Sequence, residues 1–130
     1  MTRRPKSAPR MAVGAVTRKP NRLGRMAFGF AAAMQLIVVY SPNAPAGPQI
    51  NGLDKVIHVF IFAAPVLAGL IVGISVPWTL AIFAVHAPVS ELIQHFALSH
   101  RAGDVVDMMA DLAGVVIGGL VYLVWRRRQP

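Results

Sequence analysis

A long stretch without any charged side chain sets the strongest limit on how this chain can fold. Residues 56–90 contain no Asp, Glu, Lys or Arg. A helix that crosses a bilayer needs about 20 apolar residues, so this stretch is too long for one crossing and suits two. Gly, Ser and Pro interrupt it at 73–78. Pro77 is typical of the first turn of a helix, and Trp78 is typical of the headgroup region of a bilayer. The stretch therefore predicts two membrane-spanning helices joined by a tight turn.

Two further apolar segments extend this prediction. One runs from about Met26 to Tyr40 and is stopped by residues 41–48, which hold three prolines and must form a loop. The other runs from about Asp104 to Trp125 and is followed by three arginines at 126–128. We therefore predict an all-α membrane protein with four transmembrane helices in a single domain, residues 26–125.

The charge distribution predicts the orientation of these helices. The chain has 13 Lys and Arg against 5 Asp and Glu, and 11 of the cations lie in residues 1–25 and 126–128. Lys and Arg in short loops stay on the cytoplasmic side, and an even number of crossings brings both ends to the same side. We therefore expect both termini in the cytoplasm, with 1–25 as a basic, disordered tail and 126–130 as a basic end.

Composition excludes several other classes of protein. Charged residues make up 14% of the chain, against about 25% in soluble domains. The absence of cysteine excludes disulfides, Cys-ligated zinc and thiol catalysis. No aromatic residue precedes Phe28 in the basic tail, so nucleic-acid binding is not expected. A competing interpretation makes residues 1–46 a signal peptide cleaved after Ala46, but it leaves three spans and a very long basic region.

The polar side chains of the membrane domain fall at one end of the predicted helices. They open the second helix, close the third, and occupy the last loop and the first two turns of the fourth. All of these positions are expected on the extracytoplasmic side. The residues are Asp54, Lys55, His58, Glu91, Gln94, His95, Arg101, Asp104, Asp107 and Asp111.

Helical spacing places these residues on shared faces. Glu91, Gln94 and His95 are at i, i+3 and i+4, which predicts one inward side of the third helix. The three aspartates of the fourth helix form a single stripe. Asp111 is roughly 10 Å below the start of that helix, inside the outer leaflet. We also expect Asp107 to form a coupled pair with Arg101.

A charge at the depth of Asp111 costs several kcal/mol unless it is paired, hydrogen-bonded or protonated. Its candidate partners are Arg101, Lys55 and His58. Ionisable residues within a membrane-spanning segment usually indicate a functional site. The alternative is a structural network of ion pairs that joins the helices. His86, isolated in apolar sequence, and His100, in a loop, are not assigned a role.

The spacing of these residues resembles a known family. Gly114 and Gly118 add a strip of small residues, expected to pack against another helix of the same chain. The pattern Asp54-Lys55-x-x-His58, Glu91-x-x-Gln94 and Arg101-x-x-Asp104-x-x-Asp107-x-x-x-Asp111-x-x-Gly114-x-x-x-Gly118 resembles the VanZ-like family of small bacterial integral membrane proteins. The resemblance covers about residues 54–119. The family usually has Asn where this chain has Asp111, and often Pro where it has His100.

The resemblance implies a multi-pass protein of the bacterial cytoplasmic (inner) membrane, and one member is linked to low-level resistance to the glycopeptide teicoplanin. Our leading hypothesis is that the polar residues bind a ligand of the cell envelope: a lipid-linked cell-wall precursor, a lipid headgroup, anionic lipid included, or a glycopeptide. The second is an intramembrane hydrolase or transferase acting on a phosphorylated lipid, with divalent-metal ligands from His58, Glu91, Asp107 and Asp111. A proton-coupled transporter is the third. No catalytic residue, cofactor, metal or oligomeric state is assigned from the sequence.

Overall fold

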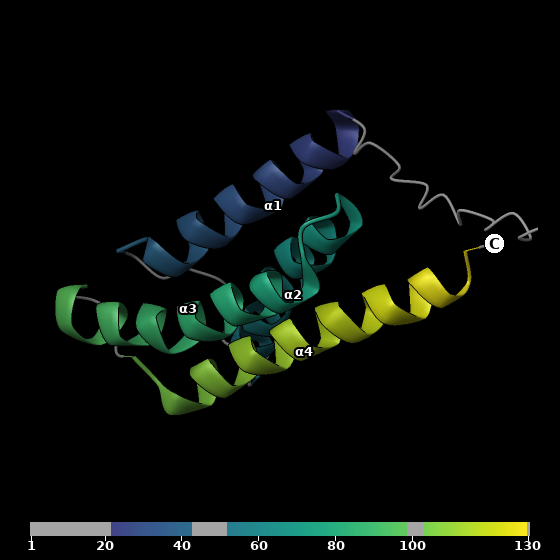
Figure 1. Cartoon of the computed structure of the whole chain (residues 1–130). Coiled ribbons are helices and arrows are strands. Elements are labelled where there is room, and N and C mark those ends of the chain that lie inside the picture. The colour runs from purple at the N-terminus through teal and green to yellow at the C-terminus, as the bar shows by residue number, and fades with distance from the viewer. Residues whose placement is uncertain (1–21, 43–51, 99–102, 130) are drawn as a thin grey trace, which may run out of the picture.

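The computed structural model describes residues 22–42, 52–98 and 103–129. These ranges form four helices: α1 (Arg22–Tyr40), α2 (Leu53–Ile71), α3 (Val76–Ala97) and α4 (Val105–Arg127) (Figure 1). Each helix is long and apolar enough to cross a membrane. The predicted all-α fold with four such helices is therefore confirmed, and it indicates a multi-pass membrane protein. Most of the predicted loop at 41–48 and most of the basic tail lie outside the described residues.

The helix boundaries differ from the predicted ones at both basic ends. The first helix begins at Arg22 rather than Met26, so the last four residues of the predicted tail are helical. The fourth helix continues past Trp125 to Arg127. Arginine is a good helix former, and its long side chain lets the charge reach the headgroup level from within a helix. The predicted helices end where the apolar residues end. The helices of the structure are longer, because they also include the neighbouring arginines.

The turn between α2 and α3 lies where the interruption at 73–78 predicts it. Gly73 has a φ of 93°, in the left-handed region that glycine adopts without strain. Pro77 lies in the first turn of α3, where a missing backbone N–H costs nothing. Proline also occurs inside α2 (Pro65) and α3 (Pro88), which neighbouring helices make tolerable in membrane proteins.

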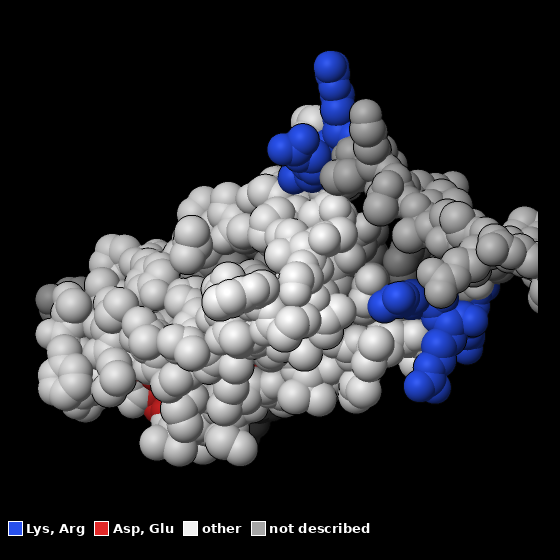
Figure 2. Space-filling model, viewed as in Figure 1, with Lys and Arg blue, Asp and Glu red and all other residues white. Residues whose placement is uncertain are grey.

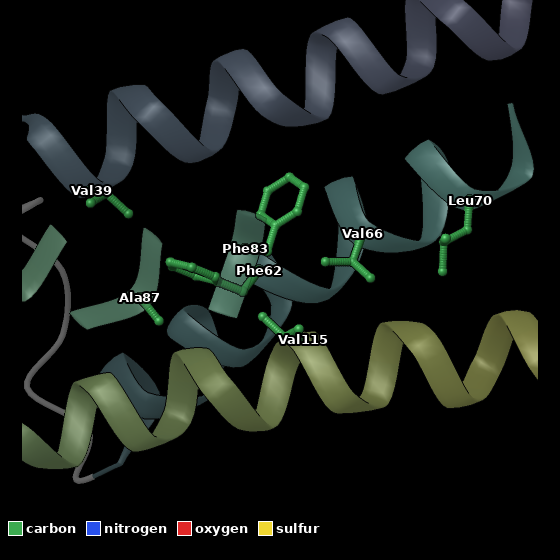
Figure 3. Close-up of a cluster of buried hydrophobic side chains, with 7 residues drawn as sticks. All are labelled: Val39, Phe62, Val66, Leu70, Phe83, Ala87 and Val115. Atoms are coloured by element: carbon green, nitrogen blue, oxygen red, sulfur yellow. The ribbon is translucent and has the colours of Figure 1, made fainter. Parts of the chain in front are cut away.

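The second helix occupies the centre of the bundle, because its contacts with the other helices are the most extensive, above all those with α4. Buried apolar side chains fill the space between the helices, and α1 to α4 all contribute (Figure 3): Val39, Phe62, Val66, Leu70, Phe83, Ala87 and Val115. Large apolar side chains also cover the outside, among them Phe30 (70% exposed) and Phe96 (79% exposed). An apolar exterior around buried polar groups is the pattern expected in lipid.

Glycines bring the backbones of α2 and α4 close together. A Cβ on Gly114 would collide with the carbonyl oxygen of Val59, and a Cβ on Gly118 would lie 2.7 Å from that of Ala63. The small-residue strip of α4 therefore faces α2 within the same chain. This close approach aligns the first turns of α2 with those of α4.

The two ends of the bundle differ in charge. The start of α1 and the end of α4 lie at the same end (Figure 1), and Lys and Arg side chains gather there, while the rest of the face seen in Figure 2 is almost free of charged residues. At the opposite end α2 begins, α3 ends and α4 begins, and all five acidic residues of the chain are within or next to these helix ends.

Candidate functional site

Polar side chains from α2, α3 and α4 converge at the acidic end of the bundle. We call this group the polar cluster. Its described members are Asp54, Lys55, His58, Glu91, Gln94, Asp104, Asp107 and Asp111. Arg101, also predicted to belong to it, lies outside the described residues.

The deepest part of the polar cluster consists of His58, Glu91 and Asp111, which we call the inner trio. Their residues are 8%, 6% and 0% exposed, respectively. His58 Nδ1 is hydrogen-bonded to Asp111 Oδ1 at 2.8 Å. Because an ionised carboxylate only accepts hydrogen bonds, Nδ1 carries the proton in that state of the pair. Asp111 Oδ2 is buried and has no hydrogen-bond partner among the described residues.

Two donors fix the position of Glu91. Gln94, one turn later on α3, donates from Nε2 to Glu91 Oε1 at 3.0 Å. The backbone N–H of Asp104 donates to Oε2 at 2.9 Å. This second bond depends on Gly103, since a Cβ at that position would collide with the carbonyl oxygen of Glu91. The turn before α4 thus orients the carboxylate of α3.

The outer part of the polar cluster is centred on Lys55, and with three aspartates it forms what we call the rim group. Lys55 Nζ lies 2.7 Å from Asp54, 3.5 Å from Asp104 and 2.5 Å from Asp107, measured to a carboxylate oxygen. Asp104 also caps α4, because its Oδ1 accepts from the N–H of Val106. The Lys55 side chain is 32% exposed, so water reaches this group.

One aspartate connects the two parts. Asp107 pairs with Lys55 through Oδ1, and its Oδ2 lies 4.0 Å from His58 Nε2. The cation beside Asp107 in the described part of the chain is therefore Lys55. The expected pair with Arg101 stays a prediction.

One side chain of α3 does not lie as the spacing suggested. His95 was expected to share the inward face with Glu91 and Gln94, but it is exposed and makes an edge-on contact with Phe96 at 4.8 Å. It belongs to the last turn of α3, where its Cβ lies against Gly103 in the turn before α4. Ser90 is fully buried, and its hydroxyl donates to the Ala87 carbonyl at 2.8 Å.

A second group of polar side chains lies between α1 and α3 and was not expected. The Tyr40 hydroxyl lies 2.9 Å from His86 Nε2, and Gln35 Nε2 lies 3.4 Å from His86 Nδ1. Phe62 stacks on the same imidazole at 5.5 Å between ring centroids. The available signal was Gln35, a polar residue in an otherwise apolar segment, which needs a partner within the bundle.

Comparison with protein-family models, with curated proteins and with solved structures found no match to this chain.

Proposed function

We propose that this chain is a VanZ-like protein of the bacterial cytoplasmic membrane that binds a ligand of the cell envelope at its polar cluster. The observation that carries the proposal is the convergence of polar side chains from three helices at one end of an apolar bundle. Burying such groups is costly and adds little net stability, whereas ionisable residues within a membrane domain characteristically mark binding sites and pathways.

The charges of the polar cluster indicate which chemical groups it suits. Carboxylates outnumber Lys55, and they accept hydrogen bonds from the hydroxyl and ammonium groups of sugars, peptides and amine headgroups. Lys55, together with Arg101, suits phosphate or carboxylate. A lipid-linked cell-wall precursor carries all of these groups, and lipid headgroups and glycopeptides carry some of them.

This proposal requires the polar cluster to face the outside of the cell, with both termini in the cytoplasm. The basic ends of α1 and α4 support that orientation through the positive-inside rule. The chain has no cysteine, so single cysteines report the topology cleanly. Cysteine at Pro42 should react with a membrane-impermeant thiol reagent in whole cells, and cysteine at Ser75 should react only after lysis. The reverse pattern would contradict the orientation.

Ligand binding can be tested by native mass spectrometry of the full chain in nanodiscs that contain a polyprenyl-diphosphate-linked disaccharide. The wild type should retain this lipid, and His58→Gln combined with Glu91→Gln should retain at least ten-fold less. Thr79→Val is the matched control, because Thr79 is a buried polar residue at the opposite end of α3. Equal retention by all three proteins would contradict the proposal.

A second candidate function is hydrolysis or transfer on a phosphorylated lipid. The hydrogen-bonded pair of His58 and Asp111 beside Glu91 favours it, because a carboxylate-oriented imidazole is a common general base. Ser90 does not serve as the nucleophile, since its buried hydroxyl is bonded to a backbone carbonyl. Release of inorganic phosphate from polyprenyl diphosphate, lost in His58→Gln, would support this function over binding alone.

A further inference from the structure

We propose that the inner trio binds one divalent first-row transition ion, Zn²⁺ or Mn²⁺. His58, Glu91 and Asp111 each offer one ligand atom, and these atoms all lie within 4.8 Å of one another. Ligands of Zn²⁺ lie at about 2.0–2.2 Å from the ion in a tetrahedral arrangement, so two of them are about 3.3–3.6 Å apart. Side-chain shifts of about 1 Å would therefore bring the three residues to ligating distances.

The unpartnered oxygen of Asp111 points independently to a ligand. Asp111 is completely buried, and its Oδ2 accepts no hydrogen bond from any described residue. Buried polar atoms in folded proteins almost always have a partner, and an exception calls for a specific explanation such as a bound ion. The ion would supply the partner that Oδ2 lacks.

Charge also favours a cation at this position. Two carboxylates and an imidazole lie together, and the described ion pairs of Lys55 involve only Asp54, Asp104 and Asp107. A divalent ion would balance the two carboxylates of the inner trio. Imidazole suits Zn²⁺ and other late transition ions, and carboxylates suit Mn²⁺ and Mg²⁺. The mixed set therefore favours Zn²⁺ or Mn²⁺ over Ca²⁺, which prefers six to eight oxygens.

The surroundings of Glu91 resemble the outer shell of a metal site. Gln94 and the backbone N–H of Asp104 each hold one carboxylate oxygen, and each oxygen keeps a second lone pair for a ligand. Outer-shell hydrogen bonds of this kind orient metal ligands in known sites. The rim group lies between the inner trio and water, and its carboxylates offer a favourable access route for a cation.

Three protein ligands leave at least one coordination position open, as in sites where a metal meets water or substrate. A phosphate oxygen of an envelope ligand would fit there, which explains how an acidic cluster binds an anion. This last step rests on the proposed function, whereas the metal site itself does not. Metal content and lipid retention are therefore measured separately.

The test uses tag-free full-length protein in detergent, treated with chelator and then dialysed against buffered Zn²⁺, Mn²⁺, Mg²⁺ or Ca²⁺. Elemental analysis should find one Zn²⁺ or Mn²⁺ per wild-type chain and less than one-tenth of that for Mg²⁺ and Ca²⁺. Asp111→Asn and His58→Gln should each weaken binding by at least 100-fold. His95→Gln, which changes an exposed histidine outside the polar cluster, is the matched control for His58→Gln and should change affinity by less than three-fold.

Circular dichroism and gel filtration establish that each variant keeps its helices, and a variant that unfolds is replaced by Glu91→Gln at the third ligand. No metal in the wild type would overturn the metal site and leave the lipid-binding proposal standing. Equal metal binding by wild type, Asp111→Asn and His58→Gln would also overturn it. Metal binding without lipid retention would uphold the site and contradict the envelope ligand.

Discussion

The inner trio and the rim group lie side by side in the polar cluster, yet they differ in how their carboxylates are paired and in how far they are exposed to water. In the rim group, one lysine pairs with three aspartates, and Asp54 has a side chain that is 57% exposed. In the inner trio, two carboxylates are buried with a single imidazole, and one oxygen lacks a hydrogen bond within the described residues. Both groups use residues of α2 and α4, and the inner trio adds Glu91 from α3.

The difference separates a structural role from a binding role. Partly exposed ion pairs contribute about 0–1 kcal/mol each and connect helix ends without a ligand. A buried carboxylate with a hydrogen bond to only one of its oxygens destabilises the fold, because the desolvation of the charge outweighs the energy of that bond. We therefore interpret the rim group as a connection between α2 and α4, and the inner trio as the part of the cluster that function requires.

Loss of His58 should have the largest effect. His58→Ala removes the hydrogen bond to Asp111 and leaves a fully buried carboxylate without a described partner. Breaking a buried pair in this way costs about 3–5 kcal/mol. Chemical unfolding of the detergent-solubilised protein, followed by circular dichroism, measures the change. The exposed His95 provides the control, and a similar loss in His95→Ala would contradict the burial of the inner trio.

Loss of Glu91 should have an intermediate effect. Glu91→Ala removes the acceptor of two hydrogen bonds, one from the Gln94 side chain and one from the Asp104 backbone. An unsatisfied buried donor costs about 1–3 kcal/mol. Its neighbour Ser90 is equally buried but makes only one local bond to a carbonyl, so Ser90→Ala should cost less than about 1 kcal/mol. Equal losses in the same unfolding assay would argue against a specific role for Glu91.

Lys55 and Asp107 should be coupled more weakly. A double-mutant cycle with Lys55→Ala and Asp107→Asn should give a coupling free energy of about 1 kcal/mol, because water reaches the pair. The same cycle with Arg101→Ala tests the pair expected from the sequence, and there too the double mutant should lose less than the sum. Strict additivity with Arg101 but not with Lys55 would show that Asp107 pairs with Lys55 and not with Arg101.

The smallest effect is expected at Asp54. Its carboxylate contacts Lys55 at 2.7 Å but is mostly exposed, so Asp54→Asn should change the free energy of unfolding by less than about 0.5 kcal/mol. A thermal melt of the variant beside wild type measures this. A loss comparable to that of His58→Ala would mean that the rim group, too, depends on a buried charge.

The sequence predicted the four helices and the level of the polar residues, because both depend on runs of apolar residues and on helical periodicity. It also placed Asp111 deep in the bundle and named His58 as one of three candidate partners, with Arg101 and Lys55. Which residues share the deepest position was not predictable, since that depends on how closely α4 approaches α2 at Gly114. For the same reason the partners of His86 were missed, because they come from α1, far away in the sequence.

The coordination of a bound ion tests the central claim most directly, namely that the inner trio rather than the rim group is the binding part. Zinc K-edge X-ray absorption on the zinc-loaded full chain reports the ligands around the metal. We predict one imidazole nitrogen and carboxylate oxygens at about 2.0–2.2 Å, with the imidazole contribution lost in His58→Gln. A shell of oxygens alone, or an imidazole contribution that persists in His58→Gln, would contradict the claim.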